Sequence, residues 1–361
     1  MACDIFKKKR NGANTMKKWI AIMSVLFLIL AAASAEGYVY SMTSVTDCAQ
    51  TDKLYTRFYE SGELSVLIPG LAEGIVPQGI SYLPEENCLL FAGYRSDKGN
   101  SALLAVSLES GELVKEVILC LPDGTPYNGH AGGVCVTEKN IYISNAYMLL
   151  RISLDTFRAL PASSECRIEE AIPVPVRSSY CCYSEGILWV GEFEYGAEYK
   201  TDTSHRVKTA DGRFKAWTCG YILTPETENE LKPEALENGG DAVPDYLLSM
   251  TERIQGFTTK EGKIYLSQSY GRRAVSLIYR YDNVLKRTPD AEGIVSGVSV
   301  PMWFLDKNAL EETLLTPPMS ECLCTVDDAI YVVFESAAQA YMAPGNASQN
   351  PIDRAFKLTG F

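Results

Sequence analysis

The fold is decided by a stretch that reads Ile254-Gln255-Gly256-Phe257-Thr258-Thr259-Lys260-Glu261-Gly262-Lys263-Ile264-Tyr265-Leu266-Ser267. Two runs rich in β-branched and aromatic residues flank a polar turn that contains glycine, and this pattern predicts a β-hairpin. The same plan occurs at four other places, with first strands that begin at Gln78, Gly132, Ser179 and Glu321. Such self-similarity is the signature of a repeat architecture.

Each copy continues into further strands, so that each repeat is a β-meander. Third strands are expected at 103–108, 149–154, 220–223, 277–281 and 354–358, and fourth strands at 113–119, 168–174, 245–250 and 300–305. A strand-like run at 63–68 precedes the first copy, and we expect it to complete the fifth unit and leave no open edge. The sequence therefore predicts an all-β protein, a five-bladed β-propeller whose last blade is closed by an N-terminal strand. A β-sandwich built from the same hairpins is the alternative, but a sandwich does not require the repeat.

The composition sets limits on the partners. The chain has 361 residues, of which 47% are apolar and 22% are charged. This amount of apolar material is enough for one large hydrophobic core or two ordinary ones. A net charge of −12 disfavours nucleic acid and anionic lipid as partners. Any anion-binding site must therefore depend on a local group of basic residues.

The N-terminus has the order of a secretory signal. Basic residues at positions 7–10, 17 and 18 precede an apolar run from Trp19 to Ala33 and the small-residue tripeptide 33–35. This order predicts cleavage before Glu36 and a secreted or extracytoplasmic protein, with Met16 as an alternative start. The other interpretation is a retained membrane anchor at residues 19–35, which is near the lower length limit for spanning a bilayer.

The remaining chain, 36–361, is expected to form one propeller domain. Its main irregularity is an insertion at about 194–242, which is either a lid over a binding site or a surface loop. The ten cysteines beyond the signal fit no small disulfide framework, and several lie in apolar runs typical of buried core positions.

One face of the ring is expected to gather polar side chains. In a propeller, the starts of the first strands and the ends of the second strands converge at the channel mouth. The equivalent starting positions are Gln78, Gly132, Ser179, Gln255 and Glu321, and two residues earlier, on the same side of the strand, stand His130, Arg177 and Arg253. The second strands end near Asn145, Glu192, Gln268 and Glu335, with Tyr94, Tyr147 and Tyr270 close by.

This composition suits a small polar or anionic molecule held by arginine forks and aromatic surfaces. A purely structural arrangement is the alternative, in which Arg177 pairs with Glu192 and Arg253 pairs with Glu335 to fill the propeller axis.

The hairpins at 254–267 and 78–91 resemble the inner hairpins of gluconolactonase and senescence-marker-protein propellers and, more loosely, of paraoxonase-like lactonases. The resemblance implies a central divalent metal held by Glu, Asn or Asp at the first residue of such strands. Here Gln78 and Gln255 occupy the best-matching positions, and only Glu321 offers a carboxylate. A hard cation needs several such oxygens, so neither a metal nor another cofactor is predicted. A divalent-cation site would have to be rebuilt from Asn145, Glu192 and Glu335.

Three functions remain open. The favoured one is a non-catalytic propeller that binds a small polar or anionic ligand, a glycan or metabolite, at the channel mouth. The second is a glycosidase- or lactonase-like hydrolase that uses Glu192 and Glu335 as a carboxyl pair. The third is a protein-interaction platform. No glycine-rich turn links a strand to a helix, and no Gly-x-Ser-x-Gly motif is present, which argues against nucleotide-dependent chemistry and a serine hydrolase.

Overall fold

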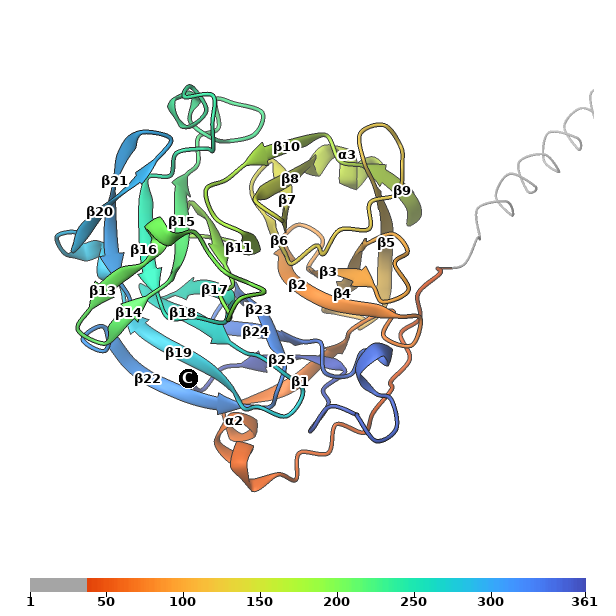
Figure 1. Cartoon of the computed structure of the whole chain (residues 1–361). Helices are drawn as coiled ribbons and strands as arrows, with labels where there is room; N and C mark the ends of the chain where they lie inside the picture. The colour runs from red at the N-terminus through yellow and green to blue at the C-terminus, as the bar shows by residue number, and fades with distance from the viewer. Residues whose placement is uncertain (1–37) are drawn as a thin grey trace, which may run out of the picture. The chain divides into compact units, whose positions relative to one another are not determined.

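The five repeated hairpins form the inner half of five sheets arranged in a ring (Figure 1). The computed structural model describes residues 38–361, and residues 40–361 form one unit. The innermost strands are β2 (Ile75–Leu83), β6 (Gly133–Val136), β11 (Ser178–Ser184), β17 (Ile254–Lys260) and β23 (Ser320–Val326). Each contacts the next in this order, and β23 returns to β2. The predicted five-bladed propeller is confirmed.

The outer strands complete each blade. The second strands are β3 (Cys88–Arg95), β7 (Asn140–Asn145), β12 (Ile187–Glu192), β18 (Lys263–Gln268) and β24 (Ala329–Phe334). The third strands are β4 (Ala102–Ser107), β8 (Met148–Ser153), β15 (Ala216–Ile222), β19 (Ser276–Asp282) and β25 (Arg354–Leu358). The fourth strands of blades one to four are β5 (Leu113–Cys120), β10 (Glu170–Pro173), β16 (Tyr246–Met250) and β22 (Leu310–Thr316). In blade five, β1 (Gly62–Leu67) pairs antiparallel with β25, as the closure prediction requires.

One strand assignment was wrong. The run at 300–305 is not the fourth strand of blade four. It lies in β21 (Val298–Phe304), which pairs parallel with β16 of blade three and antiparallel with β20 (Ala291–Val295). The cause is side-chain burial, since Val300 and Met302 pack against Trp217 and Leu247 of blade three.

The segment 194–242 contains regular structure. It includes a hairpin, β13 (Val207–Thr209) with β14 (Gly212–Phe214), and the whole of β15, the third strand of blade three. The irregular chain is therefore divided into two loops, one on each side of β15. Further elements are α2 (Thr56–Glu60), α3 (Leu154–Ala159), β9 (Ser163–Arg167), η1 (Lys53–Tyr55), η2 (Thr203–His205), η3 (Pro233–Ala235), η4 (Val284–Lys286) and η5 (Gln339–Tyr341).

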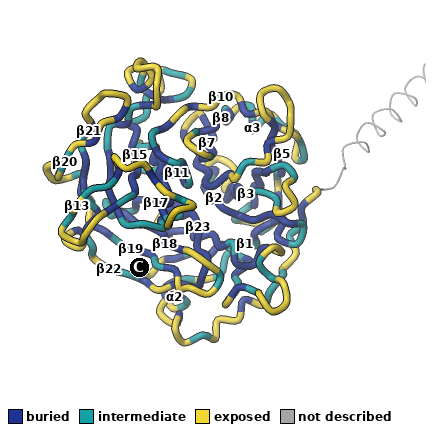
Figure 2. The backbone as a smooth tube through the Cα atoms, in the orientation of Figure 1, coloured by how far each residue is buried: buried dark blue, intermediate teal, exposed yellow. Residues whose placement is uncertain are grey.

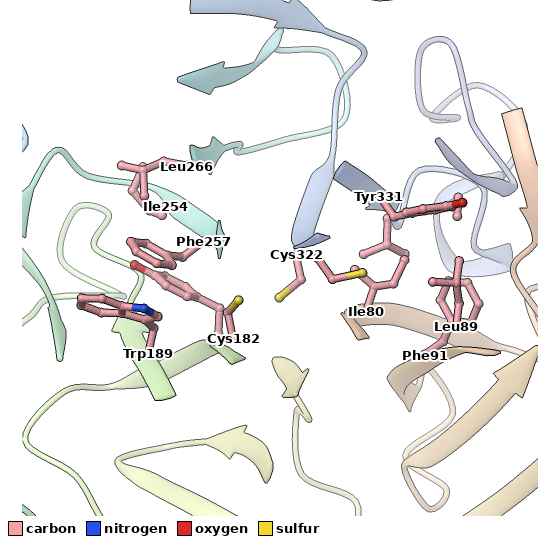
Figure 3. Close-up of a cluster of buried hydrophobic side chains, with 14 of the residues drawn as sticks. Ile80, Leu89, Phe91, Cys182, Trp189, Ile254, Phe257, Leu266, Cys322 and Tyr331 are labelled. Carbon is pink, nitrogen blue, oxygen red and sulfur yellow. The ribbon is translucent and has the colours of Figure 1, made fainter. Parts of the chain in front are cut away.

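The core lies between the blades and around the axis, where the tube in Figure 2 is mostly buried. Figure 3 shows Trp189 beside Phe257, with the ring centroids 4.9 Å apart. Glycines let the inner strands approach closely: a Cβ on Gly79 would come within 2.5 Å of backbone in β6, and one on Gly256 within 2.7 Å of backbone in β23. The inner strands are consequently packed tightly against each other along the axis.

The ten cysteines within residues 38–361 are buried and unpaired, as the core interpretation predicts. Burial raises the pKa of the Cys182 thiol to about 12, so this thiol is protonated and unreactive at neutral pH.

The signal segment 1–35 and the alternative anchor at 19–35 lie outside the described residues. Within those residues, the structure contains no helix with the length and hydrophobicity needed to cross a membrane.

Candidate functional site

The channel mouth is built on four β-bulges. In β2, β11 and β17 the pairing with the next strand skips one residue, and the skipped residues are Gln78, Ser179 and Gln255. The same irregularity in β23 falls between Ser320 and Leu323 and includes Glu321. A bulge leaves its extra residue out of the ladder and redirects the side chain. These bulged positions are four of the five equivalent positions recognised in the sequence.

A chain of four side chains crosses the mouth, and we call it the floor. The Gln78 amide donates to Glu335 Oε2 over 2.8 Å, and the Gln255 amide donates to Glu321 Oε1 over 3.1 Å. Glu321 and Glu335 are hydrogen-bonded to each other and complete the chain. Gln78 and Glu321 are buried, whereas Glu335 is partly exposed. The floor thus joins blades one, five and four and offers one carboxyl group to a ligand.

The pKa values of both floor carboxyls are raised. Burial raises the pKa of Glu335 to about 7. Burial, the Glu335 charge and the bond to Glu335 raise the pKa of Glu321 well above its ordinary value, while the same bond lowers that of Glu335. This is the pattern of a carboxylic acid that donates to a carboxylate. Near neutral pH the partly exposed Glu335 carboxyl can therefore accept a hydrogen bond when ionised or donate one when protonated.

Aromatic groups stand beside the floor. Tyr341 is hydrogen-bonded to Glu335, and its hydroxyl lies 3.1 Å from the hydroxyl of Tyr94. The Tyr94 ring stacks on His130, with the centroids 4.8 Å apart. The His130 backbone N–H donates to Asn145 Oδ1 over 3.1 Å. Loss of hydration and the nearby Arg177 charge lower the pKa of His130, which favours a neutral ring at pH 7.

Three arginines lie over tyrosine rings around the mouth. The Cζ atoms lie 5.3 Å (Arg177 over Tyr199), 5.9 Å (Arg253 over Tyr195) and 4.8 Å (Arg272 over Tyr341) from the ring centroids. Arg177 donates to the Glu198 carbonyl, and Arg272 donates to the Asn346 carbonyl. Within the described chain, their one carboxylate contact inside 4 Å is between Arg253 Nε and Glu252, at 3.8 Å. Their charges are thus only weakly compensated by nearby carboxylates.

Four aromatic rings between blades three and four form a surface that we call the platform: Phe193, Tyr195, Tyr199 and Tyr270. The Tyr195 and Tyr270 centroids are 4.0 Å apart, and Phe193 contacts both Tyr199 and Tyr270. Reciprocal backbone hydrogen bonds join Tyr195 and Tyr199. The first of the two loops that flank β15 therefore contributes an ordered aromatic surface to the mouth.

Glu192 occupies a different environment from Glu335. It is fully buried, accepts from the Trp217 backbone N–H over 3.0 Å, and lies 2.7 Å from Nδ1 of His205, whose ring stacks on Trp217. Its second oxygen accepts the backbone N–H of Arg177 over 3.3 Å. Both oxygens are occupied, so Glu192 fastens the loop that carries His205 to blade three. The ion pairs of the structural alternative, Arg177 with Glu192 and Arg253 with Glu335, are not among the ion pairs of the described residues.

Two more candidates lie at the edge of this arrangement. Gln268 is buried, donates to the Glu252 carbonyl and accepts from the Tyr279 hydroxyl, so it positions the start of β17. Tyr147 is on an exposed turn after β7, and 45% of its surface is accessible.

Some members of the site were not identified from the sequence. The sequence placed Glu321 among the equivalent starting positions but assigned it no role in a ligand site. Four other members lie outside the repeated hairpins: Tyr195, Tyr199, Tyr341 and Arg272. Only the gathering of tyrosines just after a second strand, at 195 and 199, gave a signal that could have indicated a ligand surface.

Two concave surfaces lie elsewhere, on the outer flank of blade two. Their volumes are about 380 and 650 Å³, and Arg151, Glu169 and Glu228 line both. The loop above them is held by Glu230, which accepts hydrogen bonds from Thr137 and Asn140. None of the residues predicted for the mouth lines either surface.

No known protein family matches the sequence, and no curated protein is significantly similar to it. Solved structures match the chain at low identity and low structural similarity. A GH43_1 enzyme from Xanthomonas citri complexed with xylose is 10% identical over 82% of this chain and 89% of its own, with a TM-score of 0.42. A putative glucose dehydrogenase from Thermus thermophilus is 11% identical over 82% and 98% of the two chains, with a TM-score of 0.38.

A gluconolactonase from Xanthomonas campestris is 10% identical over 72% of this chain and 70% of its own, with a TM-score of 0.34. The structural neighbours thus include the class of propeller that the two hairpins resemble, at very low identity. These similarities concern the propeller fold and carry no activity to this chain.

Proposed function

We propose that the protein binds a small polar ligand with an acidic group at the channel mouth, and that it does so outside the cytoplasm. The observation that carries this proposal is the floor, the hydrogen-bonded chain from Gln78 through Glu335 and Glu321 to Gln255. A protein that needed only to fill its axis would do so at lower cost with apolar side chains, because buried carboxyls are expensive to desolvate.

The chemistry of the mouth matches such a ligand. Because its pKa lies near neutrality, the Glu335 carboxyl can donate to a ligand oxygen or accept from a ligand hydroxyl. Arginine presents a planar fork that suits a carboxylate or phosphate, and the three rim arginines are only weakly compensated. The tyrosines supply rigid surfaces for the apolar faces of a ring. A sugar acid or a hydroxy acid combines these features.

A thermal-shift screen tests the proposal. Sugar acids, hydroxy acids and neutral sugars of the same size are added to the folded protein at pH 6 and pH 8. We expect the acids to raise Tm more than the neutral sugars, because a ligand that binds only the folded state stabilises it. Arg272→Ala, which removes the guanidinium over Tyr341 beside the floor, should reduce that shift. No shift with any acid would contradict the proposal.

A hydrolase is the second candidate, and the same floor favours it. The carboxyls that lie together are Glu335 and Glu321, whereas the hydrolase hypothesis from the sequence used Glu192 and Glu335. Two hydrogen-bonded carboxyls are closer than the roughly 5–10 Å of glycosidase pairs, but they resemble dyads that share one proton. Glu335, the partly exposed member, would accept a proton from an attacking water and deliver a proton to the leaving oxygen, while the hydrogen bond from Glu321 would hold it in place.

This second function has its own test. Esters, lactones and glycosides of the acids that bind are incubated with the wild type and with Glu335→Gln. Turnover by the wild type that is lost in the variant, while the acid still binds, would establish the hydrolase. Binding without turnover by the wild type would reject it.

A further inference from the structure

The platform is built as a second recognition zone, apart from the floor. Its rings come from the chain after β12 and from Tyr270, which follows β18, whereas the floor comes from β2, β17, β23 and the end of β24. Phe193 is buried beneath the rings, and 40% of the Tyr270 surface is accessible. The Tyr195–Tyr199 backbone bonds of 3.1 and 3.2 Å fix the orientation of the two tyrosines.

Unpartnered polar atoms accompany the platform at its blade-four side. Glu194 is 3% exposed, and its Oε2 has no hydrogen-bond partner but lies 3.7 Å from Lys215 Nζ. The buried Nε of Arg253 likewise has no hydrogen-bond partner and lies 3.8 Å from a Glu252 oxygen. The two residues are neighbours, because the Arg253 backbone N–H donates to the Glu194 carbonyl over 3.1 Å. The contacts of these two atoms with Lys215 and Glu252 are too long for hydrogen bonds, so a third group that bonded both atoms would lower the free energy. A ligand hydroxyl, which both donates and accepts, matches that requirement.

The platform has an arginine at each end, Arg177 over Tyr199 and Arg253 over Tyr195. Tyr199 is also near the floor, since the charge of Glu335 contributes to the raised pKa of its hydroxyl. A single sugar ring is roughly the size of one aromatic side chain, so it covers the floor or the platform but not both. The two zones together match a ligand with more than one unit.

We propose that the platform and its two arginines bind the second and later units of an acidic oligosaccharide whose first unit occupies the floor. The proposal rests on the proposed function, because it needs a first unit in the mouth. Each uronic-acid unit has an apolar face for the tyrosines, a carboxylate for an arginine and hydroxyls for Glu194 and Arg253. A single-stranded nucleic acid also stacks and carries charge, but it needs a continuous basic groove, and the chain has a net charge of −12.

Titration calorimetry with oligomers of increasing length tests this proposal. The titrants are the monomer, dimer and trimer of a uronic acid, neutral oligosaccharides of equal length and a short single-stranded oligonucleotide. We expect the acidic trimer to bind at least roughly tenfold more tightly than the monomer, because at least one of its two further units stacks on the platform and pairs with an arginine. The neutral trimer should show less gain, and the oligonucleotide should not bind.

Two variants and a control test whether the platform causes the higher affinity for the trimer. Tyr270→Ala and Arg253→Gln should reduce the trimer-to-monomer affinity ratio towards one. Tyr270 is partly exposed, and unchanged unfolding profiles would show that the variants fold. Arg287→Gln, at a surface ion pair with Asp290 on the outer part of blade three, should leave the ratio unchanged.

The outcomes separate the two proposals. If no acid binds at any length, the proposed function fails. If the monomer and trimer bind equally, or the neutral trimer gains as much as the acidic one, the function stands and the oligosaccharide proposal is overturned. Binding of the oligonucleotide that is lost in Tyr270→Ala would assign the platform to a nucleic acid and would also overturn it.

Discussion

At the scale of single residues, the important feature is the hydrogen-bonded carboxyl pair of Glu321 and Glu335. Each carboxyl keeps a glutamine donor of its own, so the pair is held from both sides. The sequence placed Gln78, Gln255 and Glu321 in one ring because their hairpins align. It could not show which of Glu192 and Glu335 would reach them, since that depends on His205 and Trp217, which bind Glu192 from outside the hairpins.

The pair makes a stability prediction with a definite sign. A glutamate in an unfolded chain titrates near pH 4.3, and Glu335 titrates at about 7 when folded. Between these values the folded state holds a proton that the unfolded state lacks, so the free energy of unfolding falls as pH rises. Between pH 5 and 7.5, we expect the free energy of unfolding to decrease by about 2 kcal/mol less in Glu335→Gln than in the wild type.

Chemical denaturation of the wild type and the variant at several pH values measures this difference. Glu63→Gln on the exposed face of β1 is the matched control and should follow the wild type. A pH dependence that is the same in Glu335→Gln as in the wild type would show that the pair does not share a proton near neutrality.

At the scale of elements, the bulges and the close approach of the inner strands create the site. Hairpin positions and most strand bounds follow from the alternation of apolar residues and from the turn residues, so they could be predicted. Bulges could not, because they lie near the strand starts, where too few residues precede them to reveal a shift in the alternation. The assignment of residues 300–305 to blade four was also wrong, because the alternation of apolar residues in this strand fits either neighbouring blade. The strand joins blade three because its side chains pack on Trp217.

Gly256 tests the close approach of β17 and β23. A Cβ there would lie 2.7 Å from Cys322 Cα and 2.9 Å from the Leu323 nitrogen, and these backbone atoms cannot move aside alone. We expect Gly256→Ala to lower the free energy of unfolding by about 1–3 kcal/mol. In Gly240→Ala the new Cβ meets only the Ser296 side chain, so this control should change little. Equal effects in the two variants would contradict a packed axis. Denaturant titration measures both.

At the scale of the whole molecule, the ring is closed by chain segments from opposite ends of the propeller. Strand β1 pairs with β25, and α2 packs beside them, with Phe58 stacked on Phe356 at 4.0 Å. The run at 63–68 and the lack of a fourth strand in the last repeat allowed this closure to be predicted. The contribution of α2 was not predicted, because five residues carry too little periodicity to indicate a helix.

Phe58 tests how strongly closure stabilises the molecule. The side chain is fully buried against Phe334 and Phe356. We expect Phe58→Ala to cost about 3–5 kcal/mol, the usual range for a buried phenylalanine. Leu54→Ala, at a residue that is 54% exposed, should cost far less. Thermal unfolding measures both variants, and a loss below about 1 kcal/mol in Phe58→Ala would show that closure contributes little.

The central claim is that an acidic ligand binds beside the proton-sharing carboxyls of the floor. The most direct measurement is calorimetry of one binding sugar acid at pH 7 in two buffers with different ionisation enthalpies. An anion close to Glu335 raises its pKa further, so the wild type should take up protons on binding, and Glu335→Gln should take up fewer. Binding with the same proton uptake in both proteins, or with none in the wild type, would place the ligand away from the floor and contradict the account.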